Sequence, residues 1–155
     1  MSSENHFLPG NTNRDALTTV AEEDGAAAKA RFPRALIVED EIFVAWHLES
    51  LVRDLQLEVC GLVPDGEGAI ELADNMEPDL VLMDISLSGQ LDGIEAARRI
   101  REKKNVPVIF ITAYSDAATV ARINREVPGS QVLGKPVSAD RLRSAIDVAL
   151  PGWRP

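Results

Sequence analysis

The sequence predicts an α/β fold: a doubly wound, five-stranded parallel sheet with helices on both faces. Short apolar runs typical of buried strands alternate with stripes of apolar residues at helical spacing, and the alternation occurs five times. Alternating strands and helices give a parallel sheet, because each helix returns the chain to the edge where the next strand starts. Right-handed crossovers restrict the topology, and the simplest order for five such strands is 2-1-3-4-5.

The predicted strands are short apolar runs: RALIVED (34–40), LEVCGLV (57–63), DLVLMD (79–84), VPVIFIT (106–112) and SQVLGK (130–135). The first, second and fifth helices are predicted from apolar stripes: Val44, Leu48, Leu51 and Leu55; Ala69, Leu72, Ala73 and Met76; and Leu142, Ala145, Ile146 and Ala149. Asp92, with Glu95 three residues later, resembles a capping box and predicts the start of the third helix. The fourth helix is predicted over residues 115–126, and Ser138 is the predicted cap of the fifth.

Composition limits the classes of function. The chain has 155 residues, of which 45% are hydrophobic, and this is enough for one domain with a core. The formal net charge of −9 argues against binding to nucleic acids and against docking on anionic membranes. No apolar run approaches the roughly 18–20 residues of a membrane span, and the N-terminus lacks the pattern of a secretory signal. Cys60 is the only cysteine, which excludes an internal disulfide and fits a reducing cytoplasm.

Three parts are predicted along the chain: a flexible N-terminal extension at 1–33, a folded domain at 34–150 and a short C-terminal tail at 151–155. The extension is predicted from its low content of large apolar residues. Because so few residues follow the last helix, we expect no separate output domain. The protein should then act through other proteins, as a monomer or a weak dimer.

Polar side chains stand at the ends of four predicted strands: Glu39 and Asp40 after the first, Asp84 at the third, Thr112 at the fourth and Lys135 at the fifth. The carboxyl ends of parallel strands meet at one edge of a sheet, and neighbouring strands lie roughly 4.8 Å apart. In the order 2-1-3-4-5 the first and third strands are neighbours. We therefore expect Asp40 and Asp84 to face each other at the point where the strand order reverses.

These residue types together predict phosphoryl transfer. Clustered carboxylates either raise one another's pKa or require a cation, and oxygen ligands favour a hard one, Mg²⁺ or Mn²⁺ in its place. Lys135 is long enough to bring an ammonium near Asp84, and Thr112 offers a hydroxyl on the next strand. A nucleophilic carboxylate, a metal, an ammonium and a hydroxyl form a phosphoryl-transfer site, in which Asp84 would become an aspartyl phosphate.

From about residue 34 to residue 150 the chain resembles a response-regulator receiver domain, which has a flavodoxin-like fold. The matching stretches are LIVEDE, LVLMDISLSGQLDGIEAA, VPVIFITAYSD and GKPVSADRL, in this order and at the predicted strand ends. The resemblance implies a stand-alone response regulator of a two-component system in the cytoplasm. A sensor histidine kinase or a phosphotransfer protein would phosphorylate it. It would be a signalling phosphoacceptor with slow autodephosphorylation, and not an enzyme.

The resemblance also implies a metal site. Asp84 is the phosphoacceptor and a metal ligand, and Asp40 binds Mg²⁺ directly. Glu39 binds the ion through water, and the backbone carbonyl of Ser86 is a further ligand.

The residues expected around the phosphoryl group include one departure from the family. Thr112 bonds the phosphoryl group and Lys135 pairs with it, and the bond between Lys135 and Pro136 is expected to be cis. Many receivers carry an aromatic residue three positions before this lysine, and it moves with the threonine on activation. Here the position holds Val132, so the threonine–aromatic coupling is in doubt, and Tyr114 is a substitute for part of it.

Three other functions match parts of the pattern. A haloacid-dehalogenase-like phosphatase would need a second aspartate two residues after Asp84, where the chain has Ser86. A flavodoxin-like cofactor binder would need a phosphate loop after the first strand, where the acidic run EDE would repel phosphate. A pseudo-receiver, which is a binding module that works without phosphorylation, stays open because of Val132.

The first predicted helix carries a candidate docking surface. Trp46 lies opposite the apolar stripe, and Ile42 and Phe43 lie near the rim of the predicted site. An exposed tryptophan is a suitable anchor for a partner such as a kinase, although ordinary partial exposure is the alternative.

Overall fold

The computed structural model describes residues 31–154. Within it, the residues from Pro33 onward form one compact unit. The predicted N-terminal extension, 1–33, lies outside the described residues except for its last three.

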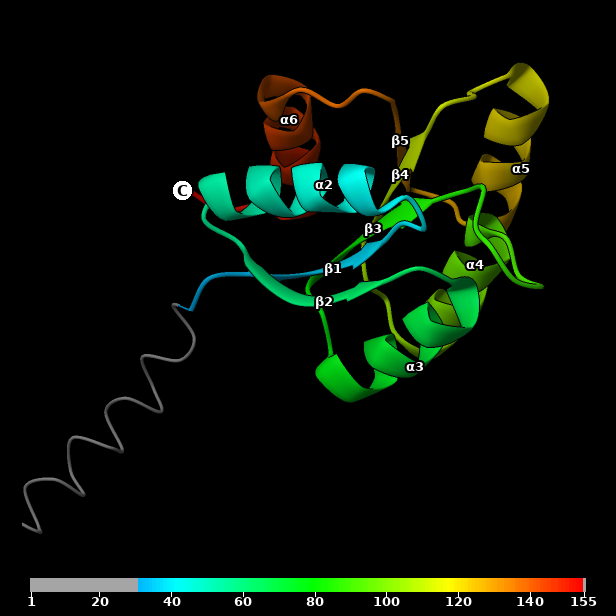
Figure 1. Ribbon diagram of the computed structural model, residues 1–155, viewed down its shortest axis with the longest axis horizontal. Helices are drawn as coiled ribbons and strands as arrows, with labels where there is room; N and C mark the ends of the chain where they lie inside the picture. Colours follow the sequence, from blue (N-terminus) through cyan, green and yellow to red (C-terminus); the bar gives the residue numbers. More distant parts are fainter. Residues whose placement is uncertain (1–30, 155) are drawn as a thin grey trace, which may run out of the picture. The chain divides into compact units, whose positions relative to one another are not determined.

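The described chain forms one sheet of five parallel strands in the order β2-β1-β3-β4-β5 (Figure 1). This confirms the predicted fold class and strand order. The strands are β1 (Arg34–Val38), β2 (Glu58–Val63), β3 (Leu80–Asp84), β4 (Val108–Thr112) and β5 (Gln131–Gly134). Val38 pairs with Met83, Asp84 with Ile111, and Thr112 with Gly134. The register therefore brings the ends of β1, β3, β4 and β5 to one edge of the sheet.

Five helices connect and cover the strands: α2 (Ile42–Asp54), α3 (Gly66–Met76), α4 (Gly93–Lys103), α5 (Ala117–Glu126) and α6 (Ala139–Ala149). Both predicted caps are confirmed: Asp92 accepts a hydrogen bond from the Glu95 N–H at 2.8 Å, and Ser138 accepts one from the Arg141 N–H at 3.3 Å. The helix expected over 115–126 begins two residues later, at Ala117, because the side chain of Asp116 caps its N-terminus.

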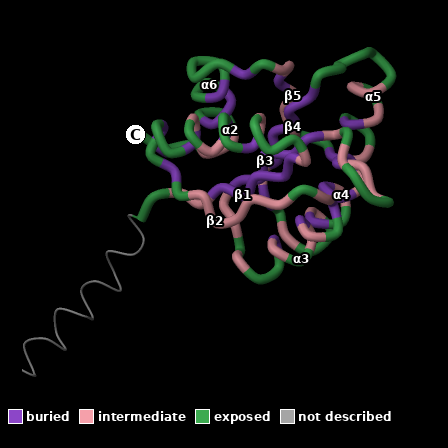
Figure 2. The backbone as a smooth tube through the Cα atoms, viewed as in Figure 1, coloured by how far each residue is buried: buried purple, intermediate pink, exposed green. Residues whose placement is uncertain are grey.

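The sheet divides the core into two layers (Figure 1). Helices α2 and α6 cover one face, and α3, α4 and α5 cover the other. Alternate residues of each strand point to opposite faces, so Ile37 and Leu82 pack on the α2 side while Leu36 and Met83 pack on the α4 side. Figure 2 shows β1, β3 and β4 as the buried centre of this arrangement, with β2 half-buried at the edge. Burial on both faces explains why the strands are continuous apolar runs in the sequence.

The predicted C-terminal tail contributes to the core. Trp153 is 8% exposed and belongs to the layer formed with α2 and α6. Its backbone N–H donates to the carbonyl of Leu150 at 3.1 Å, which turns the chain back after α6. Sequence patterns gave no sign of this packing, because the residue lies beyond the last helical stripe.

The first residue of α4, Gly93, fixes this helix against the end of β3. Its N–H donates to the carbonyl of Ile85 at 2.8 Å. A β-carbon on Gly93 would lie 1.9 Å from the carbonyl oxygen of Asp84 and within 3 Å of two further backbone atoms. The close approach of the two backbones therefore requires glycine at this position.

We expect Gly93→Ala to lower the free energy of unfolding by roughly 3 kcal/mol, because overpacking against rigid backbone costs this much. Gly134→Ala is the matched control, since a β-carbon there meets no atom within 4 Å. Urea unfolding of both variants followed by circular dichroism measures the difference. Equal stability of the two variants would contradict the close packing of α4 on β3.

Candidate functional site

Three polar residues are buried at the carboxyl edge of the sheet. Glu39, Asp84 and Thr112 are 2%, 4% and 2% exposed, and they follow or end β1, β3 and β4. Burying a charged or polar side chain is costly unless it is paired or hydrogen-bonded. The ion pairs and hydrogen bonds of these three side chains therefore indicate the chemistry of the site.

Lys135, which follows β5, brings its ammonium between the two buried carboxylates. Nζ lies 2.8 Å from Oε2 of Glu39 and 3.3 Å from Oδ2 of Asp84. Burial disfavours the charged lysine, but the contact with Glu39 and the negative charge of Asp84 outweigh this effect and raise the pKa of Lys135 above its usual value. The Lys135 side chain therefore stays protonated, which agrees with its predicted role as an ammonium near Asp84. The Lys135–Pro136 bond is cis, as expected.

Glu39 is only partly compensated. Its Oε1 accepts a hydrogen bond from the Glu41 N–H at 3.2 Å. Its Oε2 is buried and has the ion pair with Lys135, but the pair falls short of hydrogen-bond geometry and no other described residue donates to this atom. Burial, together with the charge of Asp84, raises the pKa of Glu39 to about 7 against the opposing effect of Lys135. A buried carboxylate oxygen in this state is suited to a cation.

Two further carboxylates lie close to Glu39. Glu39, Asp40 and Glu41 each offer an oxygen within 4.8 Å of the others. The sequence analysis named Glu39 and Asp40 as ligands but not Glu41, although all three belong to the run EDE. Ser86 lies in the turn after β3, and its N–H donates to Oδ1 of Asp84 at 3.3 Å.

Thr112 is engaged with the turn that follows it. Its hydroxyl donates to the carbonyl of Tyr114 at 3.0 Å and accepts from the Tyr114 N–H at 3.1 Å. The Tyr114 side chain itself is 76% exposed. Val132 packs half-buried on the α4 side of the sheet. The contact between Thr112 and Tyr114 is thus made through the backbone.

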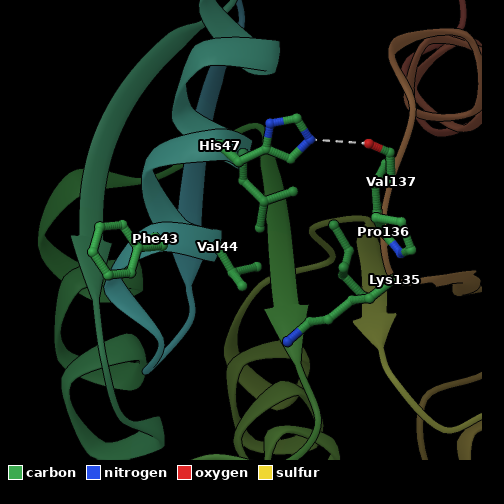
Figure 3. A pocket seen from close by; sticks show the side chains of 8 residues that line it. Phe43, Val44, His47, Lys135, Pro136 and Val137 are labelled. Carbon is green, nitrogen blue, oxygen red and sulfur yellow. Dashed lines mark hydrogen bonds between the residues drawn. The ribbon is translucent and has the colours of Figure 1, made fainter.

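A hollow of about 410 Å³ lies beside these residues, between the start of α2 and the segment from β5 to α6 (Figure 3). Its walls are mostly apolar and comprise Phe43, Val44, His47, Leu48, Ile111, Lys135, Pro136 and Val137. Nε2 of His47 lies 3.1 Å from the carbonyl oxygen of Val137, and this hydrogen bond joins the two walls. Lys135 lines the hollow and also contacts Asp84, so its side chain borders both the hollow and the buried carboxylates.

Two exposed aromatic side chains stand on α2, and one of them, Phe43, also lines the hollow. Phe43 is 78% exposed and Trp46 is 54% exposed, and their rings pack edge to face with centroids 5.7 Å apart. Ile42 beside them is 47% exposed. The sequence analysis predicted this exposed apolar group, which forms a contiguous patch on α2.

The profile of the response regulator receiver domain matches residues 35–147, which is most of the chain. The chain belongs to this family. Receiver domains are components of two-component signalling, and they generally bind Mg²⁺ at an acidic cluster such as Glu39, Asp40 and Glu41.

Relatives and solved structures agree with the family. The receiver domain is 37% identical over 131 residues to the transcriptional regulatory protein PdtaR of Mycobacterium tuberculosis, a match that covers 84% of this chain and 62% of that protein. It is 32% identical to the transcriptional regulatory protein YdfI of Bacillus subtilis, over 77% of this chain and 55% of that protein. The chain thus spans about three fifths of the length of these curated relatives.

Among solved structures, the receiver domain is similar to the signal receiver domain of a modulated diguanylate cyclase from Desulfovibrio desulfuricans. The TM-score is 0.71 at 40% identity, with 77% of this chain and 94% of that chain covered. No helix among the described residues is long and apolar enough to span a membrane.

We expect Asp84→Asn to raise the free energy of unfolding in EDTA by roughly 1 kcal/mol. Carboxylates outnumber the single ammonium in this site, and the substitution removes one negative charge while keeping the shape of the side chain. Mg²⁺ should stabilise the wild-type protein more than the variant, because the variant has lost an anionic ligand.

Chemical denaturation in EDTA and in Mg²⁺ measures both effects. Asp147→Asn on α6 is the control. Asp147 is exposed, and its substitution removes one negative charge at a position away from the site. A variant that is less stable in EDTA and responds to Mg²⁺ like the wild type would contradict the assembly of an acidic pocket around Asp84.

Proposed function

We propose that the protein is a phosphoacceptor of a two-component or phosphorelay system. A sensor histidine kinase or a phosphotransfer protein would transfer a phosphoryl group to Asp84 in a Mg²⁺-dependent reaction. The observation that carries the proposal is the Asp84 carboxylate, which is buried at the end of β3, contacts Lys135 and lies beside the acidic run after β1.

Each residue has a role that follows from its chemistry. An oxygen of Asp84 attacks phosphorus and forms the acyl phosphate, while the bond from phosphorus to the donor's histidine nitrogen breaks and the nitrogen keeps the electron pair. Lys135 neutralises charge on the phosphoryl oxygens, because its ammonium already lies 3.3 Å from the Asp84 carboxylate. The Thr112 hydroxyl donates to a phosphoryl oxygen on the side of β4.

The residues at the edge of the sheet suit Mg²⁺. Oxygen ligands and excess negative charge favour a hard divalent ion, with Mn²⁺ in its place, and the buried Oε2 of Glu39 lacks a hydrogen bond. We assign as ligands Asp40, Asp84 and the backbone carbonyl of Ser86, with Glu39 acting through water. When bound, the ion neutralises negative charge on the transferring phosphoryl group.

Output would pass through other proteins. We propose a receiver domain over 34–150 that works as a monomer or weak dimer in the cytoplasm, either through protein–protein interaction or as a phosphate shuttle or sink. The protein would be a phosphoacceptor and not an enzyme, with slow autodephosphorylation. The alternative, a pseudo-receiver that binds partners without phosphorylation, is favoured by Val132 at the position of the usual aromatic residue.

We expect acetyl phosphate with Mg²⁺ to add a single phosphoryl group to the wild-type protein, on Asp84. Asp84→Asn should remain unlabelled, because an amide is a poor nucleophile. Intact-protein mass spectrometry with and without EDTA measures the labelling, and Asp147→Asn is the control. Equal labelling of Asp84→Asn would overturn the assignment of Asp84 as the phosphoacceptor, and a wild-type protein that resists labelling at saturating Mg²⁺ would favour the pseudo-receiver.

The exposed patch of Ile42, Phe43 and Trp46 is the proposed docking surface for the kinase. A donor histidine has to approach Asp84, and Lys135, which contacts Asp84, also lines the hollow beside the patch. A protein donor therefore passes over the start of α2, whereas a small donor does not need this surface. Aromatic side chains are common anchors in such interfaces.

We expect the double substitution Phe43→Ala and Trp46→Ala to slow phosphotransfer from the kinase at least about tenfold, because each exposed aromatic anchor contributes more than 1 kcal/mol to binding. Labelling by acetyl phosphate should not change. Radiolabelled transfer from the host kinase that acts fastest on the wild-type protein measures the effect. Val148→Ala, which removes an exposed apolar side chain from α6, is the control. A variant that accepts phosphate from the kinase at the wild-type rate would show that the patch does not dock it.

A further inference from the structure

Ser88 joins the two loops that form the carboxyl edge of the sheet. Its hydroxyl donates to Oδ2 of Asp40 at 2.9 Å. Asp40 follows β1, whereas Ser88 lies in the segment between β3 and α4 that also contains Ser86. This hydrogen bond thus connects Asp40, a proposed metal ligand, to the loop that contains Ser86, another proposed ligand. The sequence analysis did not identify Ser88, because nothing in its pattern indicates which loops meet.

Contacts with residues outside the acidic cluster hold Ser88 in position. Its backbone forms an isolated parallel bridge with Asp65. The Asp65 side chain in turn caps α3 by accepting from the Gly68 N–H at 2.7 Å. At the far end of the segment, Gly93 is packed against the backbone of Asp84. The Ser88 hydroxyl is therefore presented to Asp40 by a loop that is tied to α3 and α4.

We propose that Ser88 is a positioning residue of the cation site, which holds the Asp40 carboxylate for Mg²⁺ without contacting the metal. This inference rests on the proposed function. Because a carboxylate has two oxygens, a hydrogen bond on Oδ2 still leaves Oδ1 for the cation. An aspartate on a loop otherwise loses rotational freedom when it binds a metal, and the hydrogen bond removes part of this cost in advance. Partners of this kind typically change metal affinity about 10- to 100-fold.

The role predicts which step changes. Ser88 contacts neither Asp84 nor Lys135 through any described hydrogen bond, so the reaction with the phosphoryl donor should be intact once the metal is bound. Loss of the hydroxyl should therefore raise the Mg²⁺ concentration needed for half-maximal labelling. The maximal labelling rate should stay close to that of the wild type.

The test is a calorimetric titration of the full chain with MgCl₂. We expect Ser88→Ala to raise the dissociation constant for Mg²⁺ by about tenfold, at the lower end of the range because Ser88 is exposed. Ser88→Thr keeps the hydroxyl and should stay within about twofold of the wild type, whereas Ser88→Val, which has the shape of Ser88→Thr without the hydroxyl, should behave like Ser88→Ala. Ser144→Ala, an exposed serine on α6, is the control.

Two further measurements separate the outcomes. Labelling by acetyl phosphate across a range of Mg²⁺ concentrations distinguishes weaker metal binding from slower chemistry, and melting in EDTA reports on folding without metal. If the wild type binds no Mg²⁺, the proposed metal-dependent function fails. If the wild type binds Mg²⁺ and Ser88→Val binds it equally well, the positioning role is overturned. It is also overturned if Ser88→Val lowers the labelling rate at saturating Mg²⁺ with an unchanged half-maximal concentration.

Discussion

The contact of one ammonium with two buried carboxylates is the constraint around which this fold is arranged. Lys135 reaches Glu39 at 2.8 Å and Asp84 at 3.3 Å in an environment that is nearly closed to water. Desolvating charges costs several kcal/mol for each ion, and attraction repays this only when partners are complete. A single lysine cannot complete the partners of both carboxylates, and Glu39 keeps an oxygen without a hydrogen bond. Additional positive charge would therefore stabilise this site.

The proximity of Lys135 to Asp84 could be predicted from the sequence, whereas the ion pair of Lys135 with Glu39 was not predicted. Parallel strands place their carboxyl ends together, so the residues that end each apolar run meet whatever the loops do. Asp84, Thr112 and Lys135 could be assigned on this basis, and the strand order followed from the alternation of strands and helices. The contacts that escaped prediction depend on loop conformation instead. The bond from Ser88 to Asp40 and the packing of Trp153 have no periodic signal, because each joins segments that the sequence does not pair.

The surface beside the site differs in character from the site itself. The chain carries a net charge of −9, yet the start of α2 presents Phe43 and Trp46 to solvent next to a hollow with mostly apolar walls. An acidic centre and an apolar rim suit separate physical roles: the first attracts positive charge, and the second offers area that can be buried. The two meet at Lys135, which belongs to both.

The hydroxyl of Thr112 can donate one hydrogen bond, and in this structure it donates to the carbonyl of Tyr114. If this hydroxyl donates to another acceptor, the Tyr114 carbonyl loses its hydrogen bond. The turn after β4 then has to change its conformation. This turn leads into α5, a fully described helix in which Ile123 is the one buried side chain. The helix is also held by Arg122, which is paired with Asp92 at the start of α4. A change of acceptor at Thr112 would thus pass through the backbone of this turn to α5 and to its ion pair with α4.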